Sequence, residues 1–114
     1  MNQPERRKVP EELRQGVLTA LRNDDYFIYP DGRRYLSEMG FNPPEFVVTD
    51  LIEYLTEGKP LYVLPENQAK CQCRINYEDN LIVYVKLSPI PQSDGYFVKL
   101  GFHSHNTGYT PIPD

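Results

Sequence analysis

Residues Cys71–Leu87 read CQCRINYEDNLIVYVKL, and this stretch decides the fold that the sequence predicts. Apolar and polar side chains alternate on both sides of Glu78–Asn80, a segment of turn-forming residues. Because neighbouring side chains on a strand point to opposite faces of a sheet, this alternation predicts two antiparallel strands joined by a tight turn. The sequence therefore predicts a β-hairpin with one apolar face.

Outward from the hairpin, two more segments alternate with period two, so strands are expected over residues 61–64, 69–77, 81–87 and 96–103. Two prolines in Ser88–Gly95 predict a longer loop before the last strand. Further towards the N-terminus, proline followed by glutamate, with apolar residues at helical spacing, predicts helices over residues 10–22 and 44–57.

The segment between the two helices gives weaker signals. Tyr26–Tyr29 is a short aromatic segment, and Pro30-Asp31-Gly32 has the composition of a turn. Arg33–Met39 is expected to form a brief helix that stops at Gly40.

Helices followed by an antiparallel meander indicate the α+β class, with two main N-terminal helices packed on one face of a four-stranded antiparallel sheet. A chain of 114 residues, 39% of them hydrophobic, is enough for one core and too small for two. We therefore expect a single domain over residues 1–114, with residues 1–9 as a frayed tail.

The alternation also assigns each strand residue to a face. One set is almost wholly apolar and should face the helices: Cys71, Cys73, Ile75, Leu81, Val83, Val85, Leu87, Tyr96, Val98, Leu100 and Phe102. The other set contains cations, aromatic residues and no acid: Gln72, Arg74, Asn76, Ile82, Tyr84, Lys86, Phe97, Lys99, Gly101 and His103. We call the second surface the open face. Cations interleaved with aromatic rings suit a phosphate backbone and stackable bases, so RNA is the expected ligand, bound by Arg74, Lys86, Lys99, Tyr84 and Phe97.

The two histidines of the chain, His103 and His105, stand two residues apart at the end of the last predicted strand. At this spacing both imidazoles would lie on one face, and a pair that titrates near neutral pH can supply a general acid and a general base. Tyr109 follows in a polar turn and could donate a hydrogen bond. The alternative interpretation is a polar strand end that runs into a surface turn.

Other features bound the function. The net charge of −4 argues against nonspecific nucleic-acid binding by the whole surface. The absence of a secretory signal or a long apolar run predicts a cytoplasmic protein without a membrane partner. Cys71 and Cys73 fall on the apolar face and the histidines on the other, so no zinc site and no cofactor is expected. The thiols should be reduced and buried.

The layout resembles the RelE-like and MqsR-type toxins, small ribonucleases of bacterial toxin–antitoxin systems in the barnase/EndoU/colicin/RelE fold group. Arg34–Tyr62, RYLSEMGFNPPEFVVTDLIEYLTEGKPLY, is similar to the helix–Gly–helix that precedes the sheet in MqsR-type toxins, and CQCRINYEDNLIVYVKL is similar to their central hairpin. The resemblance covers roughly residues 33–100 and is one of layout. These toxins are usually basic, whereas this chain is acidic.

The resemblance implies a metal-independent endoribonuclease with an antitoxin protein as partner. It implies a basic side chain on the inner strands, matched by Arg74 and Lys86, and a late His/Tyr group, matched by His103, His105 and Tyr109. Two other hypotheses remain open at this point. One is a non-catalytic module that binds protein or RNA through the same face, and the other is an antitoxin or immunity-type protein, which the acidic charge would suit.

Overall fold

A computed structural model describes residues 6–104 and 112 of the chain. The elements follow one another as α1 (Glu11–Arg22), β1 (Tyr26–Ile28), α2 (Pro30–Glu38), α3 (Glu45–Thr56), β2 (Tyr62–Leu64), β3 (Asn67–Asn76), the 3₁₀ turn η1 (Glu78–Asn80), β4 (Ile82–Gln92) and β5 (Gly95–His103). The α+β class is confirmed. No helix within the described residues is long and apolar enough to cross a bilayer.

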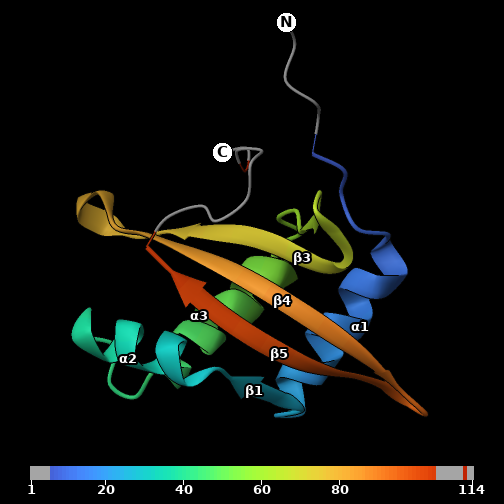
Figure 1. The fold of residues 1–114 in the computed structure, drawn as a ribbon, viewed down its shortest axis with the longest axis horizontal. Helices are drawn as coiled ribbons and strands as arrows, with labels where there is room; N and C mark the ends of the chain where they lie inside the picture. Colours follow the sequence, from blue (N-terminus) through green and yellow to red (C-terminus); the bar gives the residue numbers. More distant parts are fainter. Residues whose placement is uncertain (1–5, 105–111, 113–114) are drawn as a thin grey trace, which may run out of the picture.

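The strands form one mixed sheet with the order β1-β5-β4-β3-β2 (Figure 1). Its four later strands pair antiparallel, whereas β1 pairs parallel with β5. The prediction of four antiparallel strands was therefore wrong by one strand. The N–H of Val98 donates to the carbonyl of Asp25 at 3.0 Å, and that of Tyr29 to the carbonyl of Leu100 at 3.0 Å. A strand of three residues is too short for its alternation to be recognised in the sequence.

Helices α1 and α3 cover one face of the sheet, and Figure 1 looks onto the other face with these helices behind the strands. The covered face is the predicted apolar set: Cys73, Val83, Leu87, Val98 and Leu100 are all completely buried. Alternation of apolar side chains thus assigned the core face correctly. Burial of this face against the two helices supplies the main favourable free energy of folding.

A third helix, α2, lies beside the β1 edge of the sheet (Figure 1). It begins at Pro30, so Pro30-Asp31-Gly32 forms a first helical turn and not the expected isolated turn. Proline fits there because its fixed φ suits a helix and the missing N–H has no partner inside the helix. Gly32 packs closely, since an added Cβ atom would lie 3.2 Å from the backbone nitrogen of Phe102.

The predicted loop Ser88–Gly95 was also wrong, because β4 continues to Gln92 and pairs with β5 as far as Gln92–Gly95. The strand tolerates Pro89 and Pro91 because the ladder between β3 and β4 ends at Leu87. By alternation from Leu87, the missing N–H groups of both prolines would face the side where β3 no longer pairs. The two prolines therefore remove no ladder hydrogen bond.

The segment from Arg6 to Val9 is ordered against the sheet, in contrast to the frayed tail expected there. The N–H of Val63 donates to the carbonyl of Arg7 at 2.7 Å, and the N–H of Val9 to that of Leu61 at 2.8 Å. Lys8 forms an isolated antiparallel bridge with Tyr62. This short segment therefore covers the outer edge of β2.

Candidate functional site

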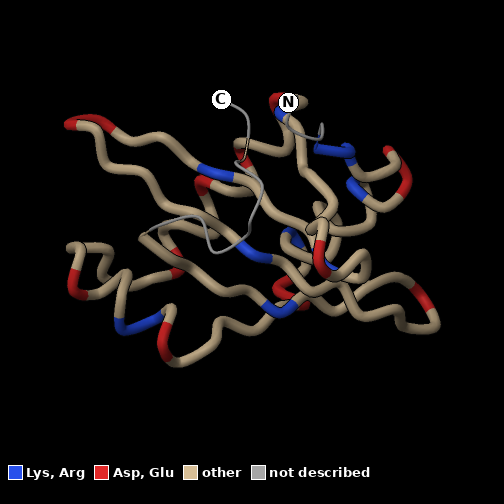
Figure 2. Tube along the Cα trace, turned by 45° about the horizontal axis from the view of Figure 1, so that its top comes forward, with Lys and Arg blue, Asp and Glu red and all other residues tan. Residues whose placement is uncertain are grey.

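The open face brings cations of three neighbouring strands together. Register pairing places Arg74, Tyr84 and His103 in one row across β3, β4 and β5. Lys86 pairs with Gly101 in the next row, and Lys99 pairs with Ser88 in the row after that. Figure 2 shows lysine and arginine positions following one another across the strands, while acidic positions lie on helices and connections. The described strands contain no Asp or Glu.

A pocket of about 410 Å³ opens on this face, between the first turn of α2 and the middle strands. Its lining comes from four elements and the residue before α2: Tyr29, Pro30, Asp31, Gly32, Lys70, Lys86, Ser88, Gly101 and His103. Two lysines, a histidine and two hydroxyl-bearing residues thus line one concave site. An anion in this pocket would meet positive charge from β3 and β4 on one side and the N-terminal end of a helix on the other.

The side chain of His103 lies over its own strand, in the space that the missing side chain of Gly101 leaves open. An added Cβ atom at Gly101 would lie 3.2 Å from Nε2 of His103, so the imidazole turns back along β5 above this glycine. Gly101 is the register partner of Lys86. The ring nitrogen therefore lies over the row that carries Lys86 and inside the pocket, where it can exchange a proton with a bound group.

Asp31 is the one carboxylate among the residues that line this pocket. Its side chain is exposed, at the first turn of α2, where a carboxylate interacts favourably with the helix dipole. Asp31 and His103 thus give the pocket two groups that can accept and donate protons. An acid and a base in one site are what proton-transfer chemistry requires.

The predicted site residues are only partly brought together. Lys86 and His103 line the pocket, and Tyr84, Arg74 and Lys99 lie in adjoining rows of the same face. Phe97 pairs with Ile90, six residues before His103, which places it roughly 20 Å away along the strand. Phe97 is therefore too far away to share this pocket. The remaining predictions, His105 and Tyr109, lie outside the described residues.

Four side chains of the site were missed by sequence reasoning: Tyr29, Asp31, Lys70 and Ser88. Lys70 and Ser88 could have been found, because they continue the alternation of the open-face residues by one step on their strands. Tyr29 and Asp31 required knowing that β1 joins the sheet beside β5 and that α2 begins at Pro30. No local pattern contains this tertiary information.

The β2 side of the open face is closed to solvent at Gln72, a residue that the alternation assigned to this face. Gln72 is only 2% exposed, although it points to this face. Nη2 of Arg6 donates to Oε1 of Gln72 at 2.8 Å and to the carbonyl of Val63 at 3.3 Å. Burial lowers the pKa of the Arg6 guanidinium, and the nearby carboxylate of Glu66 opposes this shift. Gln72 therefore belongs to a buried polar cluster and is not available to a ligand.

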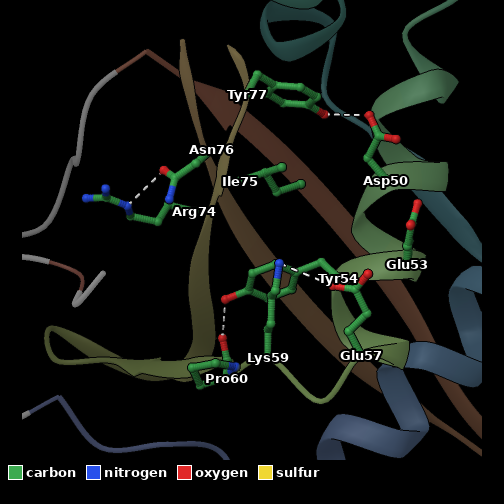
Figure 3. Close-up of a pocket in the computed structure, with 10 residues that line it drawn as sticks. All are labelled: Asp50, Glu53, Tyr54, Glu57, Lys59, Pro60, Arg74, Ile75, Asn76 and Tyr77. Atoms are coloured by element: carbon green, nitrogen blue, oxygen red, sulfur yellow. Dashed lines mark hydrogen bonds and ion pairs between the residues drawn. The ribbon is translucent and has the colours of Figure 1, made fainter. Parts of the chain in front are cut away.

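A second pocket, of about 470 Å³, lies between α3 and β3 (Figure 3). Its helix side carries Asp50, Glu53 and Glu57, which would repel a phosphate. Figure 3 shows four pairs of interacting groups around it: Tyr77 with Asp50, Lys59 with Glu57, Tyr54 with Pro60, and Arg74 with Asn76. The hydroxyl of Tyr77 donates to Asp50 at 2.7 Å, and Nζ of Lys59 lies 3.2 Å from Glu57. We therefore assign the candidate site to the open-face pocket.

The cysteines serve the core. Cys71 and Cys73 are free and buried, as predicted. Burial raises the pKa of the Cys71 thiol to about 12, and burial together with the neighbouring Cys71 raises that of Cys73. Both thiols therefore stay protonated at neutral pH and are poor nucleophiles and metal ligands. Within residues 6–104 and 112, no group of three or more His, Cys, Asp or Glu side chains is arranged to hold a metal ion.

Comparisons of the chain with models of known families, with curated proteins and with solved structures found no match.

Proposed function

We propose that this protein binds RNA on its open face and cleaves it without a metal ion, as a small ribonuclease of the toxin–antitoxin type. The observation that carries the proposal is the pocket in which Lys70, Lys86 and His103 converge beside the first turn of α2. Its cations suit one phosphate of an RNA backbone, and the strands around it contribute no opposing carboxylate.

Cleavage of RNA without a metal uses the 2′-hydroxyl of the substrate as the nucleophile. A base removes the proton of this hydroxyl as its oxygen attacks the phosphorus. The bond from phosphorus to the 5′-oxygen then breaks, and an acid gives a proton to that oxygen. The products are a 2′,3′-cyclic phosphate and a free 5′-hydroxyl, and nearby cations stabilise the pentacoordinate phosphorane between them.

His103 is the proposed proton-transfer group at the phosphate, because its Nε2 lies over Gly101 in the row of Lys86. Lys86 and Lys70 are the proposed stabilisers of the phosphorane. For the second member of the acid–base couple, the sequence pairs His103 with His105. Asp31 is the competing candidate, because it lines the same pocket as His103.

The test is a binding and cleavage assay with a fluorescently labelled single-stranded RNA in buffer that contains EDTA. We expect the wild-type protein to bind the RNA in a salt-dependent manner and to release fragments that end in a cyclic phosphate. His103→Ala should bind the RNA with nearly unchanged affinity and cleave it about 100-fold more slowly. His105→Ala and Asp31→Asn then identify the second group, because only the true partner of His103 should slow cleavage to a similar degree.

Binding without any cleavage would contradict the ribonuclease and leave a non-catalytic RNA-binding module. Absence of RNA binding would contradict both. Expression in a bacterial host is an independent readout, since a ribonuclease toxin should slow growth and His103→Ala should not. An antitoxin partner should restore growth when it is produced together with the wild-type protein.

A further inference from the structure

Two aromatic side chains stand exposed at the rim of the pocket. Phe27 is 46% exposed and Tyr29 is 41% exposed, and both are among the most exposed large hydrophobic residues of the described chain. Their ring centroids lie 5.9 Å apart, and their planes meet at 85°. A pair in this geometry forms a corner, in which a flat group can stack on the face of one ring and touch the other with its edge.

The backbone of β1 turns this corner towards the pocket. Phe27 is the register partner of Lys99, and residues paired in this way point to the same face of the sheet. The next residue on the core side, Ile28, is 1% exposed, so the alternation along β1 is regular. Tyr29 itself lines the pocket together with Lys86 and His103. Aromatic surface and positive charge therefore adjoin on one side of the sheet.

We propose that Phe27 and Tyr29 form a stacking platform for one unpaired base of the RNA, next to the phosphate that Lys86 and His103 contact. This inference rests on the proposed function and specifies its substrate as single-stranded. A base in a duplex is already stacked and paired and cannot enter the corner, whereas an unpaired base can swing onto an aromatic ring. Stacking accepts any base, so the platform selects for single strands and not for sequence.

The experiment compares three probes: a labelled single-stranded RNA octamer, the same strand annealed to its complement, and inorganic phosphate as a competitor. The variants are Phe27→Ala, Tyr29→Ala and Tyr29→Phe. The matched control is Phe46→Ala, which removes another exposed aromatic ring, 55% exposed and carried by α3 on the opposite side of the sheet. Because all four changes lie at exposed positions, thermal unfolding should verify an intact fold.

We expect Phe27→Ala and Tyr29→Ala each to weaken binding of the single strand by roughly 5- to 150-fold. Tyr29→Phe keeps the ring and should bind like the wild type, as should Phe46→Ala. Duplex affinity and competition by phosphate depend on the cations alone and should not change. If either alanine variant did not fold, Phe27→Leu and Tyr29→Leu would remove the aromatic ring with a smaller loss of side-chain volume.

The outcomes separate the platform from the proposed function. If Lys86→Ala weakens binding of the single strand but both aromatic variants bind normally, the platform is wrong and the RNA-binding face stands. Equal losses for single strand and duplex would also overturn the platform, since they would indicate a general contact. If the wild-type protein binds neither RNA probe, the proposed function itself fails.

Discussion

The two faces of the sheet are built from the same strands, but they differ in solvent exposure and in charge. On the core face, Cys73, Val83 and Leu100 are completely buried under α1 and α3. On the open face, Lys86, Lys99 and His103 are partly exposed, and the described strands carry no acid. A protein with a net charge of −4 thus keeps one cationic surface. A surface that departs in sign from the whole molecule is a candidate for binding the opposite charge.

The open face is itself divided. Towards β2, Gln72 and Arg6 are buried and hydrogen-bonded to each other, so this part behaves like an extension of the core. Towards β1, Phe27 and Tyr29 are exposed beside the pocket. The difference shows that the direction in which a side chain points does not by itself decide its role. What covers the strand decides it. The four predictions below test the contrast between the two faces and the division of the open face.

The largest effect is expected at the histidines. In a cleavage assay, His103→Ala should lose about two orders of magnitude, and the double variant with His105→Ala should lose little more than the worse single variant. Groups that act as one unit are not additive. If His105 is the partner of His103, the wild-type rate should follow a bell-shaped curve in pH with one limb for each histidine.

His103 lies on the open face and outside the core. His103→Ala should therefore also leave the free energy of unfolding almost unchanged. Urea unfolding followed by circular dichroism measures this. A large loss of stability in His103→Ala would mean that the residue belongs to the structural part of the face. Unchanged cleavage would remove it from the chemistry.

The sequence predicted the core face correctly because burial of a strand leaves a periodic pattern over many residues, from Cys71 to Phe102. The two helices that cover this face were also recognisable, through proline and glutamate at their starts and apolar stripes along them. By contrast, β1 has three residues, and its membership of the sheet depends on hydrogen bonds to Val98 and Leu100, about 70 residues later. Local patterns carry no information about such a contact.

The candidate site could likewise be predicted only where it depends on a local pattern. Lys86 and His103 follow from alternation, whereas the pocket exists only because α2 begins beside β5. The burial of Gln72 depends on Arg6, 66 residues away in the chain, so a residue expected to face solvent became structural. Pro89 and Pro91 misled the prediction of a loop, because whether a strand tolerates proline depends on where its neighbour stops pairing.

The second prediction tests the closed part of the open face. Arg6→Met keeps much of the side-chain volume but removes the donor to Gln72 and to the carbonyl of Val63. Leaving buried acceptors without this donor should lower the free energy of unfolding by roughly 1–3 kcal/mol. RNA affinity at a temperature where the variant is folded should not change. A loss of RNA binding without a loss of stability would mean that the two halves of the face have been assigned the wrong way round.

The third prediction concerns the core face and alkaline pH. The pKa of the Cys71 thiol is raised to about 12, and that of Cys73 is raised as well, so both thiols keep their protons in the folded state. In the unfolded chain, thiols ionise near pH 8.5–9. The stabilisation is therefore complete below this pH and decreases as pH rises towards the folded pKa. Between pH 8 and 9.5 the free energy of unfolding should fall by about 1.5–2.5 kcal/mol.

Urea titrations at a series of pH values measure this slope, and Cys71→Ala/Cys73→Ala is the control. The double variant should be less stable at every pH but should show a flatter dependence below pH 9.5. Tyr54 and Tyr77, whose pKa values are also raised by burial, act in the same direction only at higher pH. An unchanged slope in the cysteine variant would show that the thiols are not the groups that titrate.

The smallest effect is expected for a single cation of the open face. Lys86→Ala should weaken RNA binding by about 3- to 10-fold at low salt and leave unfolding unchanged, because the side chain is partly exposed and lies outside the core. It should also reduce the slope of log affinity against log salt by roughly 0.7, the value for one phosphate contact on a single strand. The matched control is Lys59→Ala, which removes the same charge from an exposed side chain that pairs with Glu57 beside the other pocket. If net charge alone governs binding, both variants should lose the same affinity and the same salt slope. If the open face binds the RNA, only Lys86→Ala should change the slope, because counterions are released only where a cation replaces them at the phosphate.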